Sequence, residues 1–305
     1  MFENVPVRLS NYIKQTPPEL YREGWHLLYL IAASGVVAEY LQKNFLAPSN
    51  DPYLGQQKID EAGKHWFGYP MRIMLIGTTL FRLRSCSGFS EFCRRLKGRD
   101  LRATFYETLA AKVFLRAGFE IHARAETGVK GQDLDFWATR GGDVINVEVT
   151  ALQAKQYSLR TIMDALKTKR EQLPKDGASV IFCALPEEWD GKTVDLNFAS
   201  MTAAFRFFAT TRHVNAVLFS VERHLSIGSD DSRGLFTIIN KTWANSNAKV
   251  RLKDMNFLFG DMHISDSMRR AVKHPESIPD LTDAVIIADA EEFFRWVDHL
   301  VPRDS

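Results

Sequence analysis

The chain has 305 residues, a formal net charge of +2 and 45% hydrophobic residues, so it can bury a full core in one large domain or two ordinary ones. The near-neutral charge excludes a global basic field, and any nucleic-acid surface must be a local patch. The three cysteines lack CxxC spacing and support neither a disulfide framework nor a zinc site, which favours a reducing, cytoplasmic setting.

Residues 1–98 are predicted to form a helical N-terminal module. One apolar band runs from Trp25 to Phe45, and a second apolar segment, 66–83, contains Pro70 near its start. The most apolar stretch, 27–38, is too short to span a bilayer, and the N-terminus lacks the basic and apolar regions of a signal peptide. We therefore expect no membrane partner.

The chain turns basic between Arg82 and Arg102. Charge runs are usually solvated helix faces, and that interpretation stays open here. The alternative is a strip that contacts the phosphates of a nucleic acid. The candidate contact residues are Arg94, Arg95, Lys97, Arg99 and Arg102, together with Lys167 in a later helix.

A strong helix pattern covers 102–117 and ends at Gly118, a C-cap candidate. Glu107 falls on the apolar face of this helix, four residues from both Ala103 and Ala111. An ionised side chain on that face needs a partner or a metal ion. Either Glu107 is a buried functional acid, or it lies at the edge of the face and forms a salt bridge with Arg99, Arg102 or Lys112.

Residues 119–150 are predicted to form three strands, and the last two make a β-hairpin around Gly141-Gly142. In that register Asp135 stands opposite Glu148. Directly opposed side chains have Cβ atoms about 4.5–5.5 Å apart, where two like charges are unfavourable. A divalent metal ion bound by both carboxylates would remove the conflict. A polar strand face in contact with water is the simpler alternative.

Further helices and strands follow the hairpin. An amphipathic helix is predicted over 158–173, with Ser158 as its N-cap, and a buried strand over 178–185. The order of elements in 102–185 is therefore α-β-β-β-α-β. Beyond it we expect a helix at 196–211, strands at 215–221, 235–239 and 284–288, and a helix at 291–300. The predicted fold is mixed α/β in three parts: module 1–98, core 99–185 and an extension 186–305 that packs on the core sheet.

The order of elements and three placed acids resemble the PD-(D/E)xK nuclease superfamily, which has the restriction-endonuclease-like fold. Many members carry an acid on the first helix, an Asp on the second strand and a Glu-x-Lys on the third. The matching residues here are Glu107, Asp135 and Glu148, and the resemblance covers about 102–185. Two positions depart from the pattern: Leu134 replaces the proline, and Thr150 stands where the family has its lysine.

The resemblance implies a metal-dependent endonuclease that hydrolyses phosphodiester bonds, in DNA rather than RNA. The implied catalytic residues are Glu107, Asp135, Glu148 and Thr150. The three acids and the backbone carbonyl of Val149 would hold Mg²⁺, for which Mn²⁺ can substitute. DNA is the implied partner, and a homodimer is left open.

Thr150 carries no charge, so the resemblance leaves three alternatives. Another cation reaches the site, the metal ion carries the whole task, or the site is inactive. The candidate cations are Lys130, Lys155 and Lys169. An inactive protein on the nuclease fold would bind nucleic acid or serve as a scaffold. An unrelated enzyme has little support, because the chain contains no GxxxxGK[ST], GxSxG or HExxH motif and no GxGxxG motif after a strand.

Overall fold

The computed structural model describes residues 25–42, 51, 53–54, 68–125, 127, 133–189, 195–227, 233–252, 255 and 258. The chain divides into two compact units. The first unit comprises Met1–Arg84, His224–Thr237 and His263–Ser305, and the second comprises Ser85–Arg223 and Ile238–Met262. Within the described ranges, no helix has both the length and the apolar character needed to cross a membrane.

The first unit contains two helices that pack against each other, α3 (Trp25–Leu41) and α4 (Gly68–Leu83). Their close approach depends on Gly77, where an added Cβ would lie 2.6 Å from the carbonyl oxygen of Ala33. Pro70 lies in the first turn of α4, where proline removes no helical hydrogen bond. Each apolar segment predicted as a helix therefore contains one, and α3 ends at Leu41, just before Gln42 with its positive φ of 55°.

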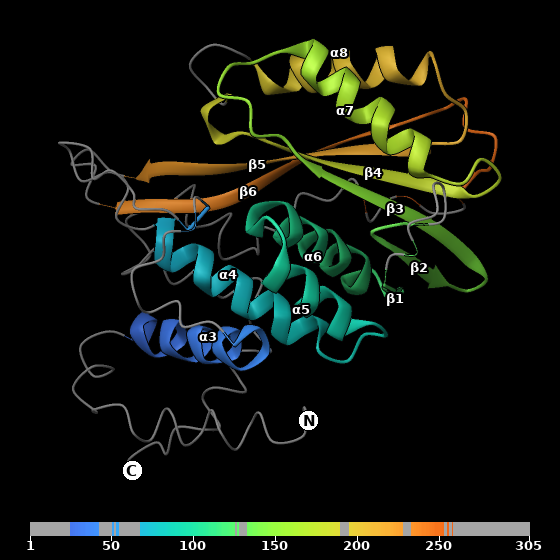
Figure 1. The fold of residues 1–305 in the computed structure, drawn as a ribbon. Helices are drawn as coiled ribbons and strands as arrows, with labels where there is room; N and C mark the ends of the chain where they lie inside the picture. The colour runs from blue at the N-terminus through green and yellow to red at the C-terminus, as the bar shows by residue number, and fades with distance from the viewer. Residues whose placement is uncertain are drawn as a thin grey trace. The chain divides into compact units, whose positions relative to one another are not determined.

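A six-stranded sheet, labelled in Figure 1, has its strands adjacent in chain order from β1 to β6. The second unit holds this sheet except for the parts of β5 and β6 within 224–237, which are grouped with the first unit. The antiparallel strands β1, β2 and β3 occupy one side, and β3, β4 and β5 run parallel. The elements are α5 (Phe89–Gly98), α6 (Leu101–Arg116), β1 (Glu120–His122), β2 (Phe136–Arg140), β3 (Asp143–Ala151), α7 (Leu159–Gln172), β4 (Ala178–Leu185), η1 (Glu187–Trp189), α8 (Leu196–Phe208), β5 (Ala216–Ile227) and β6 (Arg233–Ala244).

The β2–β3 hairpin has the register expected from its sequence. Phe136 pairs with Val147, and Arg140 pairs with Asp143 next to the turn. Gly141 and Gly142 have φ values of 56° and 87°, a left-handed pair that suits a two-residue hairpin turn. Because this turn fixes the register, it also fixes which side chains of the two strands share a face.

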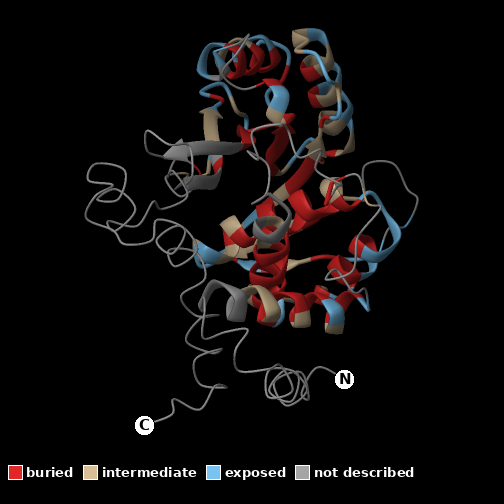
Figure 2. Cartoon of the chain, turned by 90° about the vertical axis from the view of Figure 1, so that its left-hand side faces the viewer, coloured by how far each residue is buried: buried red, intermediate tan, exposed pale blue. Residues whose placement is uncertain are grey.

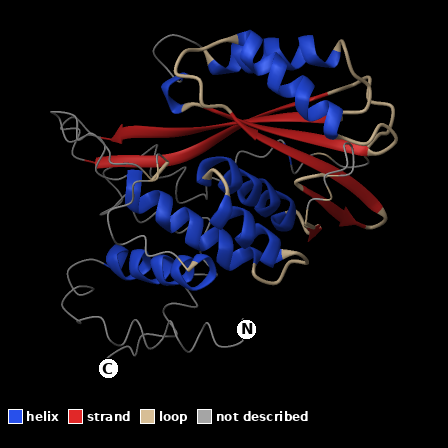
Figure 3. Cartoon of the chain, in the orientation of Figure 1, coloured by secondary structure: helices blue, strands red, loops and turns tan. Residues whose placement is uncertain are grey.

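Helices cover both faces of the sheet, as Figures 1 and 3 show: α5 and α6 on one face, α7 and α8 on the other. On the α6 face, Phe114 packs edge-on against Phe136 at a ring-centroid distance of 5.7 Å. On the α7 face, Ile162 and Leu166 belong to one apolar cluster with Ile181 of β4. Strand β4 is buried along its whole length. Figure 2 shows the buried residues in red, on strands and helices alike.

The mixed α/β class is confirmed, and the order α6-β1-β2-β3-α7-β4 is the predicted α-β-β-β-α-β order. Strands β5 and β6 extend the same sheet, as expected. The division at Ser85 groups α5 with the sheet, whereas the sequence favoured a boundary near residue 98. The three-part domain scheme therefore stays a prediction. The strand expected at 284–288 and the helix expected at 291–300 lie outside the described residues.

Candidate active site

The two acids of the hairpin meet where β2 begins. Asp135 directly precedes β2, and its carboxylate accepts a hydrogen bond from the backbone N–H of Val149 at 2.7 Å. Glu148 precedes Val149 on β3, on the face that α7 covers. Asp135 is 8% exposed and Glu148 is 1% exposed. Both carboxyl groups therefore lie inside the protein, not on a wet face of the sheet, although Asp135 stands one residue before the paired part of β2.

Lys169 supplies a positive charge to both acids. It comes from the last turn of α7, which lies over β3. Its Nζ donates to Glu148 Oε2 at 2.7 Å and to Asp135 Oδ2 at 3.4 Å. Of the three lysines considered for this role, only Lys169 is placed at the acids. Lys155 is exposed in the β3–α7 loop, and Lys130 lies outside the described residues.

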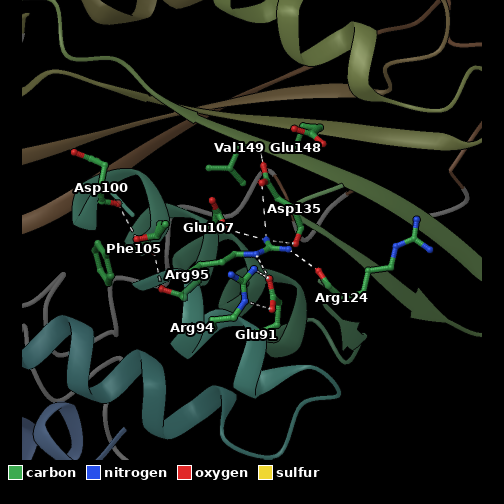
Figure 4. Close-up of polar contacts among 12 residues, drawn as sticks. Glu91, Arg94, Arg95, Asp100, Phe105, Glu107, Arg124, Asp135, Glu148 and Val149 are labelled. Carbon is green, nitrogen blue, oxygen red and sulfur yellow. Dashed lines mark hydrogen bonds and ion pairs between the residues drawn. The ribbon is translucent and has the colours of Figure 1, made fainter. Parts of the chain in front are cut away.

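Glu107 reaches the same region from α6. It is 7% exposed and accepts a hydrogen bond from Arg95 Nη1 at 3.0 Å. The same nitrogen donates to the backbone carbonyl of Asp135 at 2.7 Å, so one guanidinium joins the helix acid to the start of β2 (Figure 4). The burial of Glu107 agrees with its predicted helix face. Its partner was not predicted, because the sequence pointed to Arg99, Arg102 or Lys112.

Arg95 has to be removed from the candidate phosphate contacts. Its side chain is 1% exposed, and its guanidinium points to groups inside the protein. Helical spacing in the sequence already indicates that Arg95 is buried. Arg95 follows the buried Phe92 by three residues and therefore falls on the inward face of α5. The same test that singled out Glu107 would have identified it.

The remaining predicted contact residues divide into two groups. Arg102 donates to the carbonyl oxygens of Leu152 and, at 2.9 Å, Leu185, so its guanidinium holds the ends of β3 and β4 together. This use argues against a phosphate role for Arg102. The exposed members of the predicted set are Arg94, Lys97, Arg99 and Lys167.

Thr150 and Val149 follow Glu148 on β3. Thr150 is half-buried on β3, in register with Cys183 of β4. Val149 contacts Asp135 through its N–H, whereas the resemblance assigns its carbonyl to a metal ion. The catalytic role of Thr150 and the ligand role of the Val149 carbonyl therefore stay predictions.

Burial and the close spacing of the acids shift the pKa values of the two glutamates in the cluster. Burial and the charge of Asp135 raise the pKa of Glu148 to about 8, although Lys169 acts in the opposite direction. Burial and Asp135 likewise raise the pKa of Glu107 to about 7, against the effect of Arg95. Burial would lower the pKa of Lys169, but the charges of Asp135 and Glu148 outweigh it and raise that pKa. Near neutral pH the cluster therefore combines a charged lysine with two glutamates, Glu107 and Glu148, that readily hold a proton.

This charge balance leaves room for one more cation. Four acidic side chains are buried here, those of Glu91, Glu107, Asp135 and Glu148. Three cationic side chains contact them: Arg95 and Lys169 from inside the cluster, and Arg94 from the exposed side of α5. A proton or a bound cation can neutralise the excess negative charge.

The donor atoms suit a hard metal ion. Glu148 Oε1 is buried and has no hydrogen-bond partner, while Oε2 of the same carboxylate holds Lys169. Carboxylate oxygens are the ligands that Mg²⁺ prefers. Among the described residues, however, no three Asp, Glu, His or Cys side chains form a ready metal-binding group. The acids fit Mg²⁺ in their chemistry, and in this structure they converge on Lys169 and Arg95.

Comparisons with family models, with curated proteins and with solved structures find no match to this chain.

Proposed function

We propose that the chain is a metal-dependent nuclease that hydrolyses phosphodiester bonds, in DNA rather than RNA. The observation that carries the proposal is the meeting of Asp135, Glu148 and Lys169. Two strands and a helix bring these three residues together, with the lysine 2.7 Å from the glutamate. The lysine that the resemblance requires, but that Thr150 does not supply, thus has a counterpart on α7.

The acids Asp135, Glu148 and Glu107 would hold Mg²⁺. When bound, Mg²⁺ lowers the pKa of a coordinated water and stabilises the negative charge on a phosphate under attack. Glu148 offers its unpartnered Oε1 for this purpose. The N–H of Val149 keeps the carboxylate of Asp135 oriented at the start of β2.

Lys169 would act as a hydrogen-bond donor. The neighbouring acids raise its pKa, so it stays an ammonium group at neutral pH and cannot serve as a general base. An ammonium group in a water-poor site stabilises charge that develops on a phosphate oxygen or holds the attacking water. Because α7 carries this charge, Thr150 on β3 can remain neutral.

The test is nicking of supercoiled plasmid DNA in Mg²⁺ or Mn²⁺. We expect Asp135→Ala and Glu148→Ala to abolish nicking, and Lys169→Met to lower its rate by about 10²–10³-fold. Lys175→Met is the matched control, because Lys175 is an exposed lysine just after α7. Far-UV circular dichroism checks that each variant is folded. Cleavage that survives both acid substitutions would contradict the site, and faster cleavage of RNA than of DNA would contradict the substrate.

A second candidate function is nucleic-acid binding without hydrolysis. The observation in its favour is that Lys169 contacts both Asp135 and Glu148 and so partly neutralises them without a metal ion. The same plasmid assay separates the two functions when it is combined with a gel-shift measurement. DNA binding without nicking in Mg²⁺ and in Mn²⁺ would favour the binding protein.

A further inference from the structure

Helix α5 carries two adjacent arginines in opposite environments. The side chain of Arg94 is 58% exposed, whereas that of Arg95 is 1% exposed. Arg94 belongs to the exposed part of the predicted phosphate strip, and Arg95 contacts the candidate active site. The two residues therefore connect the protein surface to the acid cluster within a single helical turn.

Glu91 joins the two arginines. Arg94 binds it in a bidentate manner, from Nε to Oε2 at 2.7 Å and from Nη2 to Oε1 at 2.6 Å. Arg95 Nε donates to the same Oε1 at 2.9 Å. Oε1 of Glu91 is therefore shared between a surface cation and a buried one, and Figure 4 shows both arginines converging on it.

Arg95 passes this contact on to the candidate active site. Its Nη1 donates to Glu107 Oε2 at 3.0 Å and to the carbonyl of Asp135 at 2.7 Å, and its Nη2 donates to the carbonyl of Arg124 at 2.8 Å. Nη1 also lies 4.0 Å from Asp135 Oδ1. The planar guanidinium has its five donors in a fixed fork, so a shift toward Glu91 moves it with respect to Glu107 and Asp135.

We infer that the chain of contacts Arg94–Glu91–Arg95 couples the binding of a phosphate at the surface of α5 to the availability of Glu107 and Asp135 for a metal ion. This inference rests on the proposed function, because it gives the same site a substrate-dependent control. Occupation of the surface by a nucleic-acid backbone would strengthen metal binding.

The physical reason is competition for arginine charge. A phosphate is a strong bidentate partner for arginine and can take Arg94 away from Glu91. Arg95 is then the remaining partner of Glu91 in this chain of contacts, and the two side chains attract each other more strongly. Arg95 stabilises Glu107 and Asp135 less when it is drawn to Glu91. The two acids then favour a metal ion, because a poorly compensated carboxylate inside a protein needs a counter-charge.

Linkage makes the effect reciprocal. If phosphate binding at Arg94 tightens metal binding by some factor, the metal ion tightens phosphate binding by the same factor. A nuclease with this coupling would assemble its metal site mainly on DNA. The metal ion alone, without nucleic acid, would bind weakly.

The experiment measures the dissociation constant of Mn²⁺ alone by isothermal titration calorimetry. Arg94→Ala imitates the release of Glu91, and we expect it to tighten Mn²⁺ binding by about fivefold, at the lower end of measured site–site couplings. Lys175→Ala removes an exposed positive charge outside the predicted contact set and should leave the constant unchanged. In a Glu91→Gln background, Arg94→Ala should have no effect. Equal gains in Arg94→Ala and Lys175→Ala, or a gain that persists in the Glu91→Gln background, would overturn the inference.

A metal-free measurement separates this inference from the proposed function. A double-mutant cycle of Arg94→Ala and Glu107→Gln is measured by urea unfolding in EDTA. Non-additive effects that disappear in the Glu91→Gln background support the chain of contacts, and additive effects overturn it. Absence of Mn²⁺ binding in the wild type contradicts the proposed metal site, and the cycle then decides the coupling between the arginines and Glu107. Both variants are expected to keep the fold, because the side chain of Arg94 is 58% exposed and glutamine has the shape of glutamate.

Discussion

Replacing Glu148 by glutamine isolates the effect of one buried carboxyl group on stability. In the metal-free protein, burial and Asp135 raise the pKa of Glu148 from 4.5 to about 8. Between these two values the folded protein holds a proton that the unfolded chain has lost. The free energy of unfolding contributed by Glu148 therefore falls as the pH rises through this window.

The size of the effect follows from the two pKa values. A rise from 4.5 to about 8 corresponds to a loss of about 5 kcal/mol when the pH passes through the whole window. Burial and the charge of Asp135 also raise the pKa of Glu107, to about 7, so Glu107 and Glu148 share this loss. We therefore expect a change of about 2 kcal/mol or more in the stability difference between the wild type and Glu148→Gln.

The assay is urea unfolding in EDTA, followed by far-UV circular dichroism, at a series of pH values from about 5 to about 8.5. Glu148→Gln should gain on the wild type as the pH rises and be the more stable protein at the alkaline end. Glu91 does not disturb the window, because its pKa is lowered, first by the hydrogen bond from Arg94, and its contribution changes below 4.5. A stability difference that stays constant with pH would refute a buried, proton-holding Glu148.

Three further predictions test the surroundings of the site. Arg95→Ala should lower the free energy of unfolding by about 3–5 kcal/mol, because it leaves Glu91 and Glu107 without a buried counter-charge, whereas Lys97→Ala should change it by less than about 0.5 kcal/mol in the same urea titration. Gly142→Val should cost about 1–3 kcal/mol, since the position has a φ of 87°, and thermal unfolding compared with Thr139→Val tests this. Cys93 and Cys183 should not react with a thiol reagent at pH 8 until the protein unfolds, because burial raises both pKa values to about 12.

The sequence predicted the hairpin and its register because both depend on local rules. A Gly-Gly turn fixes the pairing, and strict alternation then assigns each side chain to a face. Ser158 was also predicted correctly, and it caps α7 by accepting a hydrogen bond from the N–H of Thr161. These features are encoded within a few residues of the positions that show them.

The partners of the buried acids could not be predicted in the same way. The candidates for Glu107 were cations on its own helix or just before it, whereas its partner, Arg95, comes from the preceding helix. Lys169 was one of three lysines with equal support, since nothing local indicates where the last turn of α7 will lie. Such contacts depend on how α5, α6 and α7 pack on the sheet, which is decided by the tertiary structure as a whole.

The position of Lys169 on α7 also bears on how the protein assembles. Residue Glu148 lies on β3, and its cation arrives with the helix that connects β3 to β4. The β2–β3 hairpin can form first with Glu148 still ionised and hydrated. The carboxylate of Glu148 loses its hydration only when α7 docks on the sheet. The pH dependence of the folding and unfolding rates therefore reports on that step. If α7 docks before the transition state, the folding rate changes with pH. If α7 docks afterwards, the unfolding rate changes with pH.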